Sequence, residues 1–128
     1  MTENEISFYI RKSIFSVYNE LGPGLLEKAY EKVLAYELEN NGLNVRTQVP
    51  MNLKFKDVII DSGFIADMIV EDKIIVEVKA VTEIGNIHHQ QLLTYLKLTN
   101  LKLGILVNFN TDYISKSIFR KINGKLEY

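Results

Sequence analysis

The feature that most constrains the fold of this 128-residue chain is a pair of apolar segments, residues 64–70 and 73–80, separated only by Glu71-Asp72. Both segments are rich in isoleucine and valine, which favour β-strands, and their hydrophobicity is nearly continuous rather than alternating. Strands of this kind occur where a sheet is covered on both faces. The two segments therefore predict neighbouring strands inside a sheet that has helices on each side.

Three flanking segments have the apolar period of three or four residues that is typical of amphipathic helices. They cover residues 6–21, 26–38 and about 84–99. Gly22-Pro23-Gly24 separates the first two, and Gly42 follows the second, where a glycine readily adopts the left-handed conformation that ends a helix. Two helices are thus predicted before the apolar pair in the sequence and one after it.

Further strands are predicted around the pair. Apolar and polar side chains alternate from residue 45 to 55, and Pro50 should bend this strand or confine it to a sheet edge. Residues 103–109 are another continuously apolar strand, and residues 117–122 a short last one. This order predicts an α/β fold with a central mixed β-sheet flanked by helices, in a single domain over residues 1–128.

Composition excludes several functional classes. The chain has no cysteine, which rules out disulfides, thiolate zinc sites and cysteine nucleophiles. No apolar run reaches the length of a membrane-spanning helix, and the acidic N-terminus lacks the pattern of a signal peptide. We therefore expect a cytoplasmic, bacterial-type protein with no membrane partner.

The distribution of charge is more informative than the net charge of −1. Residues 51–96 sum to −3, whereas residues 97–128 sum to +4. An acidic middle beside a basic C-terminal part suits a metal site next to a phosphate-binding surface. Ordinary solvated surface charge is the alternative, and composition alone favours it.

Two carboxylates interrupt the apolar pair. Asp67 and Glu77 each lie in the middle of a predicted strand, where an ionised carboxylate is costly unless it is paired or bound to a metal. If the turn pairs Val70 with Ile74, Asp67 lies directly opposite Glu77, with Cβ atoms roughly 5 Å apart. Two like charges at that distance favour a cation between them, and oxygen ligands suit Mg²⁺ or Mn²⁺.

Lys79 is predicted to accompany this carboxylate pair. Strand alternation places it on the same face as Glu77, about 7 Å along the strand. A lysine there can orient a water or stabilise charge on a phosphate. The alternative is a salt-bridged core in which Lys79 pairs with Glu77 or Asp67 and nothing is catalysed, and an isolated E-x-K triplet does not decide between them.

The triplet belongs to a longer ordered set. Gly63-Phe64-Ile65-Ala66-Asp67 has the form GxxxD, Glu77-Val78-Lys79 the form ExK, and Gln91-Leu92-Leu93-Thr94-Tyr95 the form QxxxY. This set resembles the RecB-like branch of the PD-(D/E)XK nuclease superfamily. Gly24-Leu25-Leu26-Glu27-Lys28-Ala29-Tyr30 resembles the signature that names the GxxExxY protein family.

The resemblance implies a restriction-endonuclease-like core that hydrolyses phosphodiesters, mostly in DNA, with Mg²⁺, for which Mn²⁺ can substitute. It implies that Lys79 is the catalytic lysine, acting with Glu77, Asp67 and Gln91. The implied metal ligands are Asp67, Glu77, the backbone carbonyl of Val78, and Glu27. The implied substrate-binding residues are Gln91, Tyr95 and Tyr30.

Several of these residues also have a structural interpretation. Glu27 near a helix N-terminus complements the helix dipole on any fold. Tyr30 and Tyr95 at helical spacing are most often core aromatics whose hydroxyls are hydrogen-bonded. Gln91 is less easily explained in this way, because a buried amide on an apolar helix face needs partners at both ends.

Three functional hypotheses follow. The first is a metal-dependent phosphodiesterase acting on nucleic acid, with DNA favoured over RNA. The second is a catalytically silent nucleic-acid-binding or protein-interaction module that keeps the nuclease fold, and the third a structural core with coincidental carboxylates. Because 128 residues leave little room for a specificity domain, sequence-specific cleavage would need a homodimer or a specificity partner.

Overall fold

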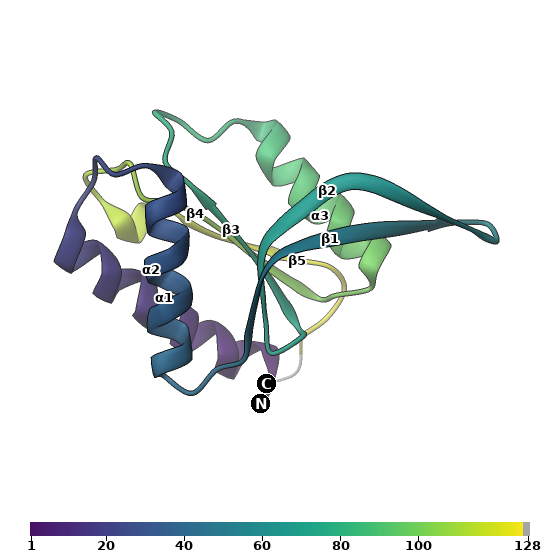
Figure 1. Ribbon diagram of the computed structural model, residues 1–128, viewed down its shortest axis with the longest axis horizontal. Coiled ribbons are helices and arrows are strands. Elements are labelled where there is room, and N and C mark those ends of the chain that lie inside the picture. The colour runs from purple at the N-terminus through teal and green to yellow at the C-terminus, as the bar shows by residue number, and fades with distance from the viewer. Residues whose placement is uncertain (127–128) are drawn as a thin grey trace.

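The computed structural model describes residues 1–126, which form a five-stranded sheet with helices on both faces (Figure 1). This arrangement confirms the predicted α/β fold with a mixed sheet. The elements are α1 (Glu3–Leu21), α2 (Glu27–Asn40), β1 (Val45–Phe55), β2 (Val58–Val70), β3 (Ile74–Lys79), α3 (Asn86–Thr99), β4 (Leu103–Asn108), the 3-10 helix η1 (Ile114–Lys116) and β5 (Ile118–Ile122).

The strands are ordered β1-β2-β3-β4-β5 across the sheet. Three neighbouring pairs are antiparallel, and β3 and β4 are parallel. Parallel neighbours need a long connection, and α3 supplies it between β3 and β4. Pro50 lies in the edge strand β1, beside a shift in its register against β2, as the sequence predicts.

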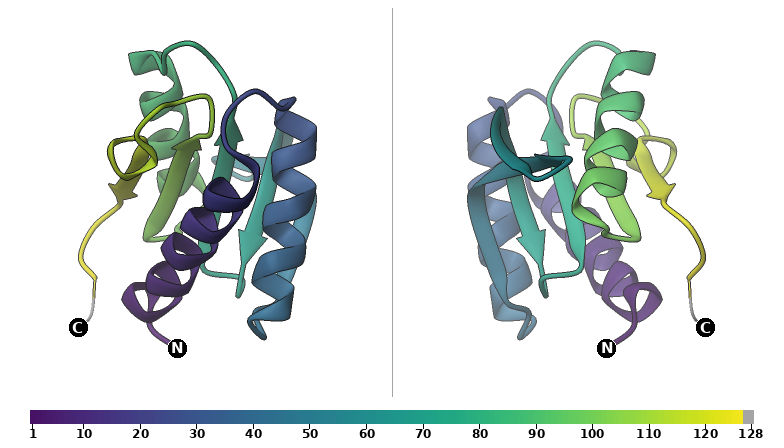
Figure 2. Two further views of the ribbon diagram at one scale, coloured as in Figure 1. Left: turned by 90° about the vertical axis from the view of Figure 1, so that its left-hand side faces the viewer. Right: turned by 90° about the vertical axis from the view of Figure 1, so that its right-hand side faces the viewer.

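Apolar side chains form two cores, one on each face of the sheet. α1 and α2 cover the first face and α3 covers the other (Figure 2). Strand β3 contributes alternately to both cores, with Ile74 and Val76 in the first and Ile75 in the second. Burial on both faces explains why this strand is continuously apolar.

The ends of the first two helices follow local capping rules. Thr2 and Glu5 form a reciprocal capping box at the start of α1. Gly42, with φ 83°, follows α2, and the Leu43 N–H donates to the Leu38 carbonyl at 3.2 Å, which confirms the predicted left-handed end of this helix. Within residues 1–126, no helix combines the length and the apolar character needed to cross a membrane.

The outer parts of β1 and β2 form a two-stranded ribbon that leaves the sheet (Figure 1). The β1–β2 ladder runs from Val45↔Val70 to Phe55↔Val58, whereas β2 pairs with β3 only from Val70↔Ile74 to Met68↔Val76. The sequence did not predict the strand over residues 58–63. The ribbon diverges from the sheet where the two predicted carboxylates lie.

Candidate active site

Asp67 and Glu77 lie where β2 and β3 diverge, just beyond the last backbone pair. The Asp67 N–H donates to Glu77 Oε2 at 2.8 Å, and the Val78 N–H donates to Asp67 Oδ2 at 2.8 Å. Each carboxylate therefore accepts a hydrogen bond from the opposite strand, in place of a backbone carbonyl. The observed Val70↔Ile74 pair is the one from which the sequence predicted that these two residues face each other.

Both carboxyls are costly to ionise in this position. Burial raises the pKa of Glu77 to about 8, and the adjacent charge of Asp67 adds to the effect. Burial also raises the pKa of Asp67, and the charge of Glu31 contributes. A divalent cation between the two carboxylates would remove most of this penalty, because it would offset both charges.

Lys79 follows Glu77 on the same face of the sheet. Glu77 pairs with Leu106 and Lys79 with Asn108 in the parallel β3–β4 ladder, and alternate residues of a strand share a face. In the part of the chain that the structure describes, the one ion pair joins Arg46 and Asp72. The direct salt bridge of the alternative is therefore not formed within residues 1–126, although the charge of Lys79 acts to lower the pKa of both Asp67 and Glu77.

Helix α2 brings two more carboxylates towards Asp67. Glu27, in its first turn, accepts a hydrogen bond from the Ala80 N–H at 3.3 Å, so that the helix begins at the end of β3. Glu31, one turn later, is only 6% exposed, and the charges of Glu31 and Glu27 both raise the pKa of Asp67. Sequence reasoning missed Glu31, although its spacing of four residues from Glu27 places both on one helix face.

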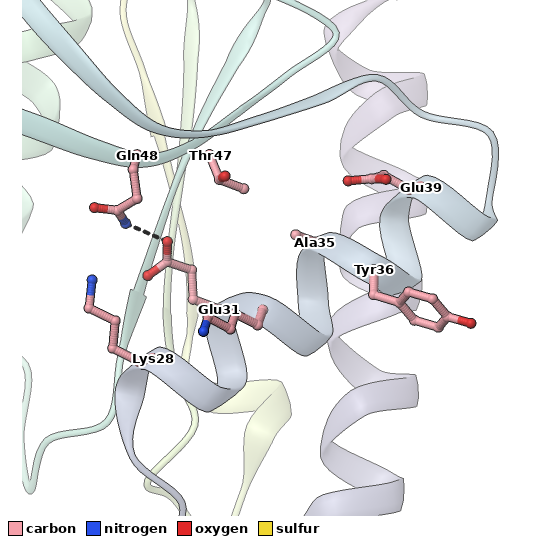
Figure 3. A pocket seen from close by; sticks show the side chains of 8 residues that line it. Lys28, Glu31, Ala35, Tyr36, Glu39, Thr47 and Gln48 are labelled. Carbon is pink, nitrogen blue, oxygen red and sulfur yellow. Dashed lines mark hydrogen bonds between the residues drawn. The ribbon is translucent and has the colours of Figure 1, made fainter.

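Gln48 holds Glu31 from the other side. It lies opposite Asp67, between the pairs Thr47↔Met68 and Val49↔Ala66, and has a φ of 51°, which is uncommon for a residue other than glycine. Its Nε2 donates to Glu31 Oε1 (Figure 3). No pattern in the sequence signals this backbone conformation or this contact.

A groove between α2 and β1 adjoins these residues. It encloses a cavity of about 320 Å³, with the buried Glu31 carboxylate and Gln48 in its wall (Figure 3). The lining side chains are those of Lys28, Glu31, Lys32, Ala35, Tyr36, Glu39, Thr47 and Gln48. We refer to this cavity as the α2–β1 groove.

Tyr30 lies in the hydrophobic core beneath α1 and α2. It is fully buried, its ring stacks on Phe109 with centroids 4.5 Å apart, and its hydroxyl donates to the Gly22 carbonyl at 2.5 Å. The same oxygen accepts a hydrogen bond from the Leu25 N–H at 3.1 Å. Tyr30 thus fixes the turn before α2, and its complete burial is inconsistent with the predicted contact to substrate.

The other two predicted substrate-binding residues lie on α3. Tyr95 is half-buried, and its ring stacks on Phe64 of the ribbon with centroids 3.9 Å apart. Gln91 is exposed, so that the expectation of a buried amide is wrong. Its side chain lies on the outer side of the amphipathic helix, whereas Leu92 and Leu96 face the sheet. The catalytic role of Gln91 stays a prediction.

The carboxylates suit a cation but do not form a complete ligand set. Within residues 1–126, no three His, Cys, Asp or Glu side chains are arranged to hold a metal ion. Asp67 and Glu77 supply two adjacent oxygen donors that form no salt bridge within residues 1–126, a donor set that fits a hard divalent cation. The predicted third carboxylate, Glu27, is instead hydrogen-bonded to the Ala80 backbone.

The comparison with protein families agrees with this geometry. A model described as the PD-(D/E)XK nuclease superfamily matches residues 4–121, from the first turn of α1 into β5. No curated protein and no solved structure gives a significant match. The matched range contains Asp67 and the Glu77-Val78-Lys79 triplet. The chain therefore belongs to the PD-(D/E)XK nuclease superfamily.

Proposed function

We propose that the protein is a nuclease that hydrolyses phosphodiester bonds in nucleic acid with Mg²⁺ or Mn²⁺, and that its substrate is DNA rather than RNA. The observation that carries the proposal is the pair of buried carboxylates at the divergence of β2 and β3. Asp67 and Glu77 are held against each other by backbone N–H donors, and neither forms a salt bridge within residues 1–126. Lys79 lies two residues further along the same face.

The side chains have distinct roles in this proposal. Asp67, Glu77 and the Val78 carbonyl would hold the cation, and Glu27, which accepts a hydrogen bond from the Ala80 N–H, would support it. A cation held there would supply Lewis-acid polarisation of the phosphodiester and would lower the pKa of a water. The Lys79 ammonium, which forms no direct salt bridge within residues 1–126, would stabilise negative charge that develops on the phosphoryl oxygens.

We further propose membership of the GxxExxY family within the RecB-like branch of the superfamily. The contacts of the signature residues support this proposal. Gly24 has a φ of 110°, in the turn that the Tyr30 hydroxyl fixes, and this turn sets Glu27 against Ala80. The glycine and the tyrosine of the signature thus shape the turn that places the carboxylate of its glutamate. Gln91 and Tyr95 are proposed to position Lys79 or the substrate phosphate.

Cleavage of a panel of labelled DNA and RNA strands, duplexes and branched forms tests the activity. With Mg²⁺ or Mn²⁺ we expect cutting by the wild type, and a loss of at least about 100-fold for Glu77→Gln and for Lys79→Ala. Lys12→Ala, which removes an exposed lysine of α1, is the matched control and should retain full activity. Cutting that persists in both site variants would exclude this site as its source.

A catalytically silent module is the second candidate, and the incomplete ligand set favours it. Glu27 is hydrogen-bonded to Ala80, and no group of three ligands is formed within residues 1–126. In that case nucleic acid or a protein would still bind, while titration with Mn²⁺ would show no uptake. Calorimetry of Mn²⁺ binding with the wild type and Glu77→Gln separates the two candidates, because the nuclease requires uptake that the variant loses.

A second copy of the chain or a specificity partner completes the proposal, and a cytoplasmic location suits a nucleic-acid substrate. One face of the ribbon tip carries exposed apolar side chains, with Phe55 at 64% and its pair Val58 at 58% exposure. Such a surface suits contact between copies. Sedimentation should give a mass that rises with concentration, and Phe55→Ser should abolish the rise. A mass that stays monomeric at every concentration would exclude the homodimer and leave the specificity partner as the remaining proposal.

A further inference from the structure

The outer side of α2 presents groups that the chemistry above does not use. Lys28, Lys32 and Tyr36 are spaced by four residues and therefore lie in a row on one helix face. All three are exposed and line the α2–β1 groove, and Tyr36 projects outwards at one end (Figure 3). Successive members of the row are about 6 Å apart along the helix axis.

The two lysines have charge available for a ligand. In residues 1–126 neither is part of an ion pair, since the one such pair joins Arg46 and Asp72. Glu31, on the same helix, is buried and hydrogen-bonded to Gln48. The exposed charge at this end of the groove is therefore positive.

This row lies beside the candidate active site. Gln48 is opposite Asp67 in the β1–β2 ladder, and Glu31 influences the pKa of Asp67. The Gln48–Glu31 pair is thus a wall shared by the groove and the site. A polyanion that approaches the clustered carboxylates is repelled by them, so that favourable charge has to come from groups at their side. Lys28 and Lys32 are suitably placed to provide it.

The residue types indicate the kind of ligand. A groove that combines cationic side chains with an exposed aromatic ring is typical of surfaces that bind single strands, where phosphates contact the cations and a base stacks on the ring. In a duplex the base faces are covered by their neighbours and cannot stack on Tyr36.

We propose that the α2–β1 groove binds a single-stranded segment of nucleic acid, with Lys28 and Lys32 on two phosphates and Tyr36 stacked on a base. The inference rests on the proposed function only in placing the scissile bond next to the groove. Glu39, three residues beyond Tyr36 at the same end of the row, carries the opposite charge and marks where the strand leaves α2. The groove thereby selects substrates that have an unpaired segment beside the cleavage position.

Binding without cleavage tests this assignment. The probe is a labelled DNA oligonucleotide, single-stranded or annealed to its complement, bound to the whole wild-type chain in EDTA, and an RNA strand of the same sequence forms a third arm. We expect tighter binding of the single strands than of the duplex. The double variant Lys28→Gln/Lys32→Gln should bind the single strand roughly tenfold more weakly than the wild type. It should also reduce the slope of log affinity against log salt by about 0.7 per lost phosphate contact.

The aromatic ring and two distant lysines provide the controls. Tyr36→Ala should weaken strand binding by about 5-fold to 100-fold, whereas Tyr36→Phe keeps the stacking face and should bind like the wild type. Lys12→Gln with Lys97→Gln removes the same charge from exposed positions on α1 and α3, and should leave the salt slope unchanged. Circular dichroism confirms that each variant is folded.

The proposal is overturned if the strand does not bind, if the duplex binds as tightly, or if the groove variants match the controls. These outcomes are distinguishable from failure of the nuclease proposal, because EDTA prevents metal-dependent cleavage in every arm. Strand binding that depends on Lys28, Lys32 and Tyr36 supports the groove even if no substrate is cut. Cleavage together with binding that is insensitive to these residues retains the nuclease and rejects the groove.

Discussion

At the scale of single residues, Glu77 links stability to pH. Its pKa is about 8 in the folded chain and 4.5 in its ordinary state, so the folded form holds its proton more tightly. The contribution of Glu77 to stability is therefore complete below pH 4.5 and is lost as pH rises through 8. Without divalent cations, we expect Glu77→Gln to gain stability over the wild type from pH 5 to pH 8, by on the order of a few kcal/mol.

Chemical denaturation of both proteins at each pH measures this difference, in which the titration of groups remote from Glu77 cancels while that of the adjacent Asp67 does not. Mn²⁺ should stabilise the wild type and not the variant, because the ion holds the ionised carboxylates together. Below pH 8 its uptake should also release protons, which calorimetry in buffers of different ionisation enthalpy detects. A stability difference that stays constant across the range would contradict the raised pKa of Glu77.

The residues of the site differ in how far the sequence predicts them. The positions of Asp67 and Glu77 are predictable. The short turn fixes the register of the two strands, and strand alternation determines on which side of the sheet each side chain lies. The positions of Glu31 and Gln48 are not predictable, since their contact joins a helix to a strand and depends on tertiary packing. Gln91 was misplaced because its helix has a narrow apolar stripe, which leaves this position in solvent.

At the scale of elements, the connection between α1 and α2 depends on the Tyr30 hydroxyl. Tyr30→Phe should destabilise the fold by about 1–2 kcal/mol, because the Gly22 carbonyl and the Leu25 N–H both lose their partner. Tyr36→Phe removes a hydroxyl from an exposed ring of the same helix and should change stability by less than about 0.5 kcal/mol. Urea unfolding of the two variants makes the comparison, and equal stabilities would refute the role of the hydroxyl.

The contact between α3 and β4 depends on the absence of a side chain. A methyl group at Gly104 would lie 2.8 Å from Leu92 Cδ1, and Leu92 is itself buried. Gly104→Ala should therefore cost about 1–3 kcal/mol through overpacking. Gly85→Ser is the control, because this position has open space and begins α3, where serine is a favoured cap. Thermal unfolding should show a loss for the first variant only.

Elements are predictable from the sequence where burial is regular. The three helices and the central strands follow apolar periods that packing against the sheet enforces. The outer ribbon departs from this rule, since Ile59 is 71% exposed and Ile60 45% exposed, and Gly63 with φ 75° interrupts the alternation. A strand that is not half-buried has no pattern by which to recognise it.

At the scale of the whole molecule, one sheet couples the two cores. Strand β4 places Ile105 in the first core and Leu106 in the second, so that neither core is complete without the other face. Leu34→Ala in the first core and Leu92→Ala in the second should each cost about 2–5 kcal/mol. Both variants should still unfold in one transition, with coincident far-ultraviolet circular dichroism and tyrosine fluorescence. Separate transitions in either variant would show that the cores are independent.

The carboxylate bonds at the divergence of β2 and β3 also have a consequence for hydrogen exchange. The amide hydrogens of Asp67 and Val78 are protected by side chains, whereas neighbouring strand amides are protected by carbonyls. A side chain can turn towards a bound ion without any opening of the sheet. Cation binding should therefore speed deuterium uptake at these two positions while it slows uptake elsewhere. Hydrogen exchange at these two amides thus reports directly whether the cation is bound.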